Sequence, residues 1–216
     1  MNLFKIHTNK GVKEIAVADC WEPNPKSDPP KTNQCTTAQY QKLAVDWDGE
    51  DLVKLFSILS GMEYKALANT HDFILEEQLL AATRFIYNDF QDFKEASPPH
   101  WIEINGKQIR IPKQIGALSI GQSIHVRQAL DKLKVYEELI AFVVAIYLQP
   151  LYDGTEFDFH RAMELEQDVL KLPIAKTYPL GIFFLKRLTK PGVNIMSKLS
   201  FSITRLLQVL SKSERA

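Results

Sequence analysis

The chain has 216 residues, of which 45% are hydrophobic and 24% are charged, a balance that predicts a folded globular protein and excludes a disordered one. Lys and Arg total 26 and Asp and Glu total 26, so the overall charge offers no long-range attraction to nucleic acid or to an anionic membrane and argues against both as partners. The longest apolar run, 139–148, is about half of the roughly 20 residues that a membrane-spanning helix needs.

The N-terminal residues 1–18 predict a β-hairpin. Apolar and polar residues alternate, and a turn at Lys10-Gly11 places four apolar side chains on one face: Phe4, Ile6, Ile15 and Val17. Residues 19–35 predict an extended connector, because repeated prolines exclude a helix and remove strand donors. Cys20 and Cys35 flank this connector. Since residues 1–11 lack the apolar core of a secretory signal, we expect two reduced thiols, with a disulfide as the alternative.

Helices are predicted between residues 36 and 86. Thr36 or Thr37 caps the first, and Asp48 caps a second that ends at Gly61, a residue suited to a left-handed C-terminus. A short helical turn over 62–68 follows, and a longer helix starts at Asp72. The inward stripes have helical spacing: Tyr40, Leu43, Ala44 and Trp47 in the first; Leu52, Leu55, Phe56 and Leu59 in the second; Ile74, Leu75, Leu79, Ala82 and Ile86 in the longer one.

Residues 101–111 predict a second hairpin around Asn105-Gly106, the pair that a type I′ turn favours. In that register Ile102 opposes Ile109, and Ile104 and Ile111 share their face, while Glu103 and Gln108 point the other way. The hairpin also carries a small basic and aromatic patch of Trp101, Lys107, Arg110 and Lys113. Binding of nucleic acid to such a patch is one interpretation. Glu103 on the patch argues against that interpretation.

Further helices are predicted after Pro112. They cover 121–133, 135–149 with Pro150 as its end, 158–170 with an Asp158 cap, and a helix capped by Thr177 that closes at Pro191-Gly192. Residues 191–216 predict a last, amphipathic helix with Ser, Thr, Lys and Arg opposite its apolar stripe. That helix has three interpretations: a core element, a partner-binding helix or a membrane-surface anchor. Serines fill most of its polar face, which argues against the anchor.

The common sequence motifs of enzymes are missing, including the nucleotide-binding glycine loops, His-Glu-x-x-His, Gly-x-Ser-x-Gly and paired Cys-x-x-Cys. We therefore predict a chain without catalytic activity, cofactor, metal or small-molecule substrate. One alternative is a metal-dependent enzyme, because His160 and Glu164 are four residues apart on a predicted helix, with Glu156 nearby. Such pairs are common on solvent-exposed helices.

Together these elements predict a mainly α (α+β) fold, a helical bundle with one hairpin at the N-terminus and a second near 101–111. Four segments are expected: the hairpin 1–18, the connector 19–35, a helical core with the inserted hairpin over 36–190, and the amphipathic helix 191–216.

The order of elements carries a family resemblance. It rests on Trp21 before the connector and on six further stretches: Thr36-Thr37-Ala-Gln-Tyr40-Gln41, Leu55-Phe-Ser-Ile-Leu-Ser-Gly61, the hairpin 102–110, Gly121-Gln122, Ala145-Ile-Tyr-Leu-Gln-Pro150 and Pro179-Leu-Gly-Ile-Phe-Phe184. This pattern, spanning about residues 3–188, resembles tailed-bacteriophage proteins described as tail assembly chaperone-like or as small virion structural proteins, including those of crAss-like phages. The connector and the helix after Pro191 depart from it.

The resemblance implies a non-enzymatic morphogenesis protein, either an assembly chaperone or a structural component of the tail or neck. Its partners would be other phage structural proteins, in the host cytoplasm during assembly or in the virion. A ring-forming or internal virion subunit, and hence a homo-oligomer, is the alternative. No family active site exists to transfer. The predicted partner-binding residues are Met196, Leu199, Ile203, Leu206 and Leu210 of the last helix, Phe183 and Phe184, and Trp21 of the connector.

Truncation after Pro191 tests the last helix. We expect the shortened chain to keep its fold and to lose partner binding, because the apolar stripe is removed while the predicted core is retained. Circular dichroism and co-purification with the partner measure the two effects, and unchanged binding would contradict a role for this helix.

Overall fold

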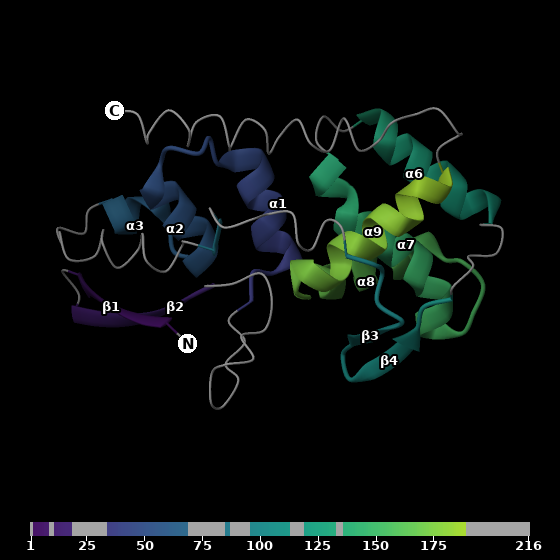
Figure 1. The fold of residues 1–216 in the computed structure, drawn as a ribbon, viewed down its shortest axis with the longest axis horizontal. Coiled ribbons are helices and arrows are strands. Elements are labelled where there is room, and N and C mark those ends of the chain that lie inside the picture. The colour runs from purple at the N-terminus through teal and green to yellow at the C-terminus, as the bar shows by residue number, and fades with distance from the viewer. Residues whose placement is uncertain are drawn as a thin grey trace.

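The computed structural model describes most of the chain, and its described part consists mainly of helices with two antiparallel β-hairpins (Figure 1), as the sequence predicts. Most of the connector 19–35, nearly all of the helix predicted from Asp72 and the whole segment 191–216 lie outside the described residues. Those described are 2–8, 11–18, 34–68, 85–86, 96–112, 119–132 and 136–188.

The N-terminal hairpin consists of β1 (Asn2–Thr8) and β2 (Gly11–Val17). Thr8 pairs with Gly11, so Gly11 is the first residue of the second strand and not the turn residue that we predicted. The resulting shift in pairing is two residues, an even number, which leaves the described side chains of the hairpin on their expected faces. Phe4 and Ile15 are accordingly paired and buried.

Helix α1 (Thr37–Asp46) is capped by Thr36, one of the two threonines predicted for this role. The Thr36 hydroxyl accepts from the Gln39 backbone N–H, and Gln39 Oε1 accepts from the Thr36 N–H at 2.9 Å, a reciprocal capping box. The other end of the same Gln39 side chain reaches a different helix, since its Nε2 donates to the Leu59 carbonyl at 2.8 Å. One amide therefore caps α1 and links it to α2.

Helix α2 (Leu52–Ser60) is capped by Asp51, not by Asp48 as predicted. Asp48 instead accepts hydrogen bonds from the Glu50 and Asp51 N–H groups in the turn before the helix. Gly61 ends α2 with a φ of 72°, the left-handed conformation expected there. The short helix α3 (Tyr64–Ala68) follows, and Phe4 of β1 packs edge-on against Phe56 of α2.

The C-terminal part of the described chain is built around one helix, α7 (Ile140–Asp153), which is buried over most of its length. It contacts α1, β4 and every helical element that follows the second hairpin. The second hairpin consists of β3 (Trp101–Ile104) and β4 (Lys107–Arg110). The helical elements after it are α6 (Ile120–Lys132), the 3₁₀ helix η1 (Tyr136–Leu139), α8 (Phe159–Val169) and α9 (Ile174–Leu188).

Pro150 does not end α7, contrary to our prediction; the helix continues to Asp153 and ends at Gly154, whose φ is 71°. A proline has no N–H, so the Ile146 carbonyl loses its helical donor. Gln122 of α6 replaces it, donating from its buried Nε2 to Ile146 O at 2.8 Å. The Oε1 of the same side chain accepts from the Ser119 N–H and caps α6. The helix therefore tolerates its proline through a tertiary contact.

Thr177 is not the N-cap of the helix that we predicted at this place, because α9 begins three residues earlier, at Ile174. The Thr177 hydroxyl is fully buried and lies 2.7 Å from the Thr37 hydroxyl at the start of α1. Backbone bonds reinforce this junction: the Thr37 N–H donates to Leu172 O and the Ile174 N–H donates to Cys35 O. The first turns of α1 and α9 are thereby joined.

Two tyrosines fill the core beside this junction. Tyr40 and Tyr178 meet edge to face at 5.8 Å, with the buried Glu137 of η1 nearby. Burial raises the pKa of both phenols, and the Glu137 charge raises the two pKa values further. Both hydroxyls therefore stay protonated at physiological pH. Elsewhere in the core Gly181 of α9 lies so close to α7 that an added Cβ would be 3.1 Å from Ile140 Cδ1.

Among the described helices, none combines the length and the apolar content that crossing a membrane requires.

Replacing Gln122 by Met should destabilise the fold by about 1–3 kcal/mol, because the Ile146 carbonyl and the Ser119 N–H lose their partner. In a Pro150→Ala background the loss should be smaller, since residue 150 then supplies its own N–H to Ile146. Urea unfolding measures the loss of stability in both backgrounds. Gln128→Met on the exposed face of α6 is the control, and an equal loss in the two backgrounds would show that the carbonyl link is not the cause.

Candidate protein-binding site

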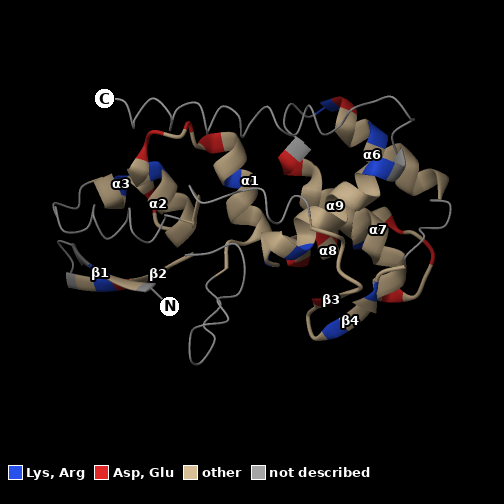
Figure 2. Cartoon of the chain, in the orientation of Figure 1, with Lys and Arg blue, Asp and Glu red and all other residues tan. Residues whose placement is uncertain are grey.

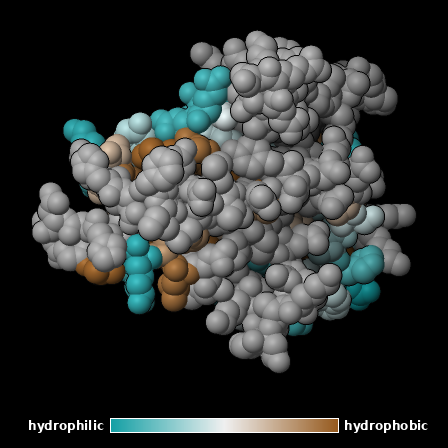
Figure 3. Space-filling model, turned by 60° about the vertical axis from the view of Figure 1, so that its left-hand side comes forward, coloured by the Kyte–Doolittle hydropathy of each residue, from teal (hydrophilic) through white to brown (hydrophobic). Residues whose placement is uncertain are grey.

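Several large apolar side chains are exposed on the described surface. Among the coloured residues of the face in Figure 3, hydrophobic residues lie next to hydrophilic ones. Two of the exposed side chains line a common groove, Trp101 on β3 and Leu151 near the end of α7. The complete set is Leu3, Val12, Val45, Tyr64, Trp101, Ile120, Ile124 and Leu151.

The hairpin β3–β4 is a rigid support for this groove. Asn105 and Gly106 have φ values of 50° and 75°, which fits the predicted type I′ turn. Ile102 pairs with Ile109 as predicted, and both are buried together with the two isoleucines that share their face, Ile104 and Ile111. The apolar face therefore packs on the helices and the opposite face points to solvent.

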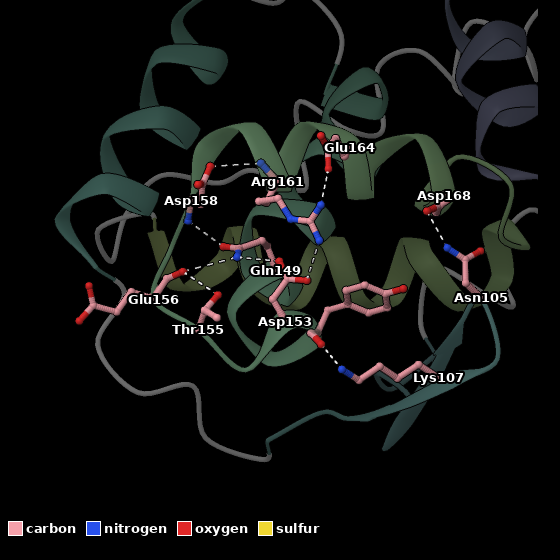
Figure 4. Close-up of polar contacts among 11 residues, drawn as sticks. Asn105, Lys107, Gln149, Asp153, Thr155, Glu156, Asp158, Arg161, Glu164 and Asp168 are labelled. Atoms are coloured by element: carbon pink, nitrogen blue, oxygen red, sulfur yellow. Dashed lines mark hydrogen bonds and ion pairs between the residues drawn. The ribbon is translucent and has the colours of Figure 1, made fainter.

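Polar contacts fix the hairpin at both sides of its turn (Figure 4). Asn105 Nδ2 donates to the Asp168 carboxylate of α8 at 2.7 Å, and the Lys107 ammonium donates to the Tyr152 carbonyl of α7. Lys107 also lies over the Tyr152 ring, 5.0 Å from its centroid. These bonds hold the hairpin against the ends of two helices.

The groove lies where the two strands leave the hairpin, and its volume is about 750 Å³. Trp101 is 54% exposed and Leu151 is 45% exposed, so apolar surface is presented to solvent on both sides of it. Arg110 pairs with Trp101 across the two strands, and its guanidinium lies 5.8 Å from the centroid of the Trp101 ring. The lining residues are His100, Trp101, Arg110, Ile111, Pro112 and Leu151.

The charge of the groove comes from Arg110. Within the described part of the chain its guanidinium makes no ion pair, whereas Lys107 of the same strand is occupied by Tyr152. Figure 2 shows basic residues on β4. Arg110 is therefore a cation placed beside an exposed aromatic ring.

The connection between α7 and α8 holds the end of α7 in place. Buried Gln149 accepts from the Asp158 N–H at 2.9 Å and donates to the Asp153 carboxylate at 3.0 Å (Figure 4). Asp158 caps α8 as predicted, and Arg161 binds both Asp153 and Glu164. The amide of Gln149 and then the Arg161 guanidinium hold the pKa of Asp153 below its ordinary value.

The alternative metal site is not assembled. Among the residues that the structure describes, no three His, Cys, Asp or Glu side chains lie together in a way that could hold a metal ion. Glu156, His160 and Glu164 are all described, and Glu164 is ion-paired with Arg161 at 2.6 Å. The helical spacing of His160 and Glu164 therefore belongs to a solvent-exposed face.

The predicted partner-binding residues have different locations. Phe184 is buried and stacks on Tyr147 at 4.0 Å, so its ring belongs to the α7–α9 contact and is not presented to a partner in this fold. Phe183 is half-buried beside it. Trp21 and the five residues of the last helix lie outside the described residues. Cys35 is buried, while Cys20 is not described.

The sequence predicts the hairpin side of the groove, because Trp101 and Arg110 belong to the basic and aromatic patch considered above for nucleic acid. The hairpin alternation already placed Trp101 and Arg110 on the outer face. The Leu151 side of the groove was not predicted, because Pro150 was expected to end the helix that carries Leu151.

No protein-family model, no curated protein and no solved structure matches the chain.

The carboxylates that support the site provide a test by titration. The Lys171 ammonium and then the Asn105 amide hold the pKa of Asp168 below its ordinary value. Arg161→Met should raise the pKa of Asp153 and leave that of Asp168 unchanged, and Lys171→Met should do the reverse, as carboxyl ¹³C NMR would show. Because folding lowers these pKa values, their stabilisation is complete above the ordinary Asp pKa and is lost as the pH falls through the lowered values. A shift of both pKa values in either variant would contradict these separate contacts.

Proposed function

We propose that the chain is a non-enzymatic morphogenesis protein of a tailed bacteriophage, an assembly chaperone or a structural component of the tail or neck. It acts in the host cytoplasm by binding another phage structural protein, or it enters the virion with that protein. The phage context is drawn from the resemblance in the order of elements. Partner binding is supported by the groove on the β3–β4 hairpin.

The observation that carries the binding role is the exposure of Trp101 next to Arg110 on a fixed hairpin. Trp and Arg are the residue types that most often dominate the energy of protein interfaces. Their support is rigid, since the turn is bonded to α8 and the second strand to α7. A rigid surface loses little conformational entropy when a partner binds.

Mass spectrometry of purified particles and of infected lysate tests the proposal. A structural component should be present in particles at a fixed ratio to the portal, whereas a chaperone should be absent from particles and bound to a phage structural protein in the lysate. If the chain is absent from particles and binds no phage protein, the proposed function is wrong.

The double substitution Trp101→Ala and Arg110→Ala should lower this association by tenfold or more, a loss on the order of 2 kcal/mol that is typical of interface hot spots. Quantitative mass spectrometry of particles or of co-purified complexes measures it. Gln108→Ala is the matched control, because Gln108 is exposed on the same strand but does not line the groove.

A further inference from the structure

The groove on the β3–β4 hairpin has the chemistry of a peptide site, and the following inference rests on the proposed function because it names the partner segment that this groove takes. We propose that the groove binds an acidic peptide segment, with a large apolar side chain between Trp101 and Leu151 and a carboxylate on Arg110. The three residues line one groove and come from β3, α7 and β4.

The apolar part of the site is large enough for one side chain. Trp101 and Leu151 each leave about half of their surface in water, and Ile111 and Pro112 also line the groove. Covering such surface is favourable by about 25 cal/mol per Å². An aromatic or long aliphatic side chain of the partner would remove both exposed residues from water at once.

Charge complementarity selects an acidic partner. Arg110 is the strong cation of the groove and makes no ion pair with any described residue, and its planar guanidinium can bind a carboxylate with two hydrogen bonds. Lys107 is occupied by the Tyr152 carbonyl. Glu103 lies on the same solvent face but does not line the groove, so Arg110 is the part of this face that favours a carboxylate.

The hairpin backbone can hold an extended segment. The described sheet has only two strands, so each strand has an unpaired edge. The Ile111 N–H donates to His100 O at 2.8 Å, and in an antiparallel ladder the next pair, Trp101 with Arg110, turns its backbone groups outward. A peptide lying beside either residue would find main-chain donors and acceptors there. Nucleic acid is disfavoured because its backbone needs several cations, whereas Arg110 is the one Lys or Arg in the described lining of the groove.

Indole NMR of the full-length chain tests this proposal. With ¹⁵N-labelled Trp the signal of Trp101 is assigned by its loss in Trp101→Phe, and acetyl-Asp-Phe-Asp-amide is the probe. The peptide should shift the Trp101 signal saturably and leave that of Trp47 unchanged, because Trp47 is buried and donates to Asp51 O. Arg110→Gln should weaken binding about tenfold, and Gln108→Ala should leave it unchanged.

Two further peptides separate the contributions. Acetyl-Lys-Phe-Lys-amide and acetyl-Asp-Ala-Asp-amide should each bind at least about tenfold more weakly, since one lacks the carboxylates and the other lacks the apolar side chain. Equal binding of all three, no saturable shift, or no effect of Arg110→Gln would overturn the proposal. So would a saturable shift with hexathymidylate in place of the acidic peptide. Both substituted side chains are exposed, and the Trp47 signal reports that the fold is intact.

The two proposals fail in different measurements. If the peptide binds as expected but the chain associates with no phage protein, the proposed function is wrong and the peptide site stands. If the chain is found with a phage protein but the groove does not bind the peptide, the proposed function stands and the partner segment inferred for this groove is wrong.

Discussion

A helix buried on nearly all sides, α7, imposes the constraint on which the remaining structure depends. Every backbone group along it must find a partner away from water, because a buried group without one costs about 1–3 kcal/mol. Pro150 removes one donor, and the Gln122 side chain restores it from a neighbouring helix. The position of α6 is thus set by a single carbonyl as well as by apolar packing.

Glutamine side chains repeat this role across the fold. Gln39 and Gln122 each cap the start of their own helix with the oxygen and reach a carbonyl of another helix with the nitrogen. Gln41 donates to the carbonyls of Glu137 and Glu138, and Gln149 links α7 to the cap of α8. An amide has both a donor and an acceptor, so one side chain can satisfy two backbone ends at once. The helices are therefore joined at their ends by directional bonds.

Local chemistry made much of the fold predictable. Asn105-Gly106, the Thr36 cap and Gly61 each specify backbone geometry within a few residues, and the structure has all three. The errors arise where the deciding partner is distant in sequence. Pro150 stays within a helix because of Gln122, and Thr177 faces Thr37 and not its own helix start. Asp48 and Asp51 are an exception, since two nearby carboxylates compete for the same cap. The groove needed both a local hairpin and the extension of α7, so sequence reasoning could reach only its Trp101 side.

The junction between the starts of α1 and α9 also determines when the fold can be completed during synthesis. Its two side-chain bonds join residues 135 and 140 positions apart, Thr37 to Leu172 and Thr37 to Thr177. Contacts of such separation form late, because the intervening chain must first be made and closed into a loop. In a nascent chain that ends before α9, the first turn of α1 lacks the residues that bury it in the complete fold. Quality control on the ribosome or by proteases thus meets an incomplete core until nearly the whole described chain has emerged.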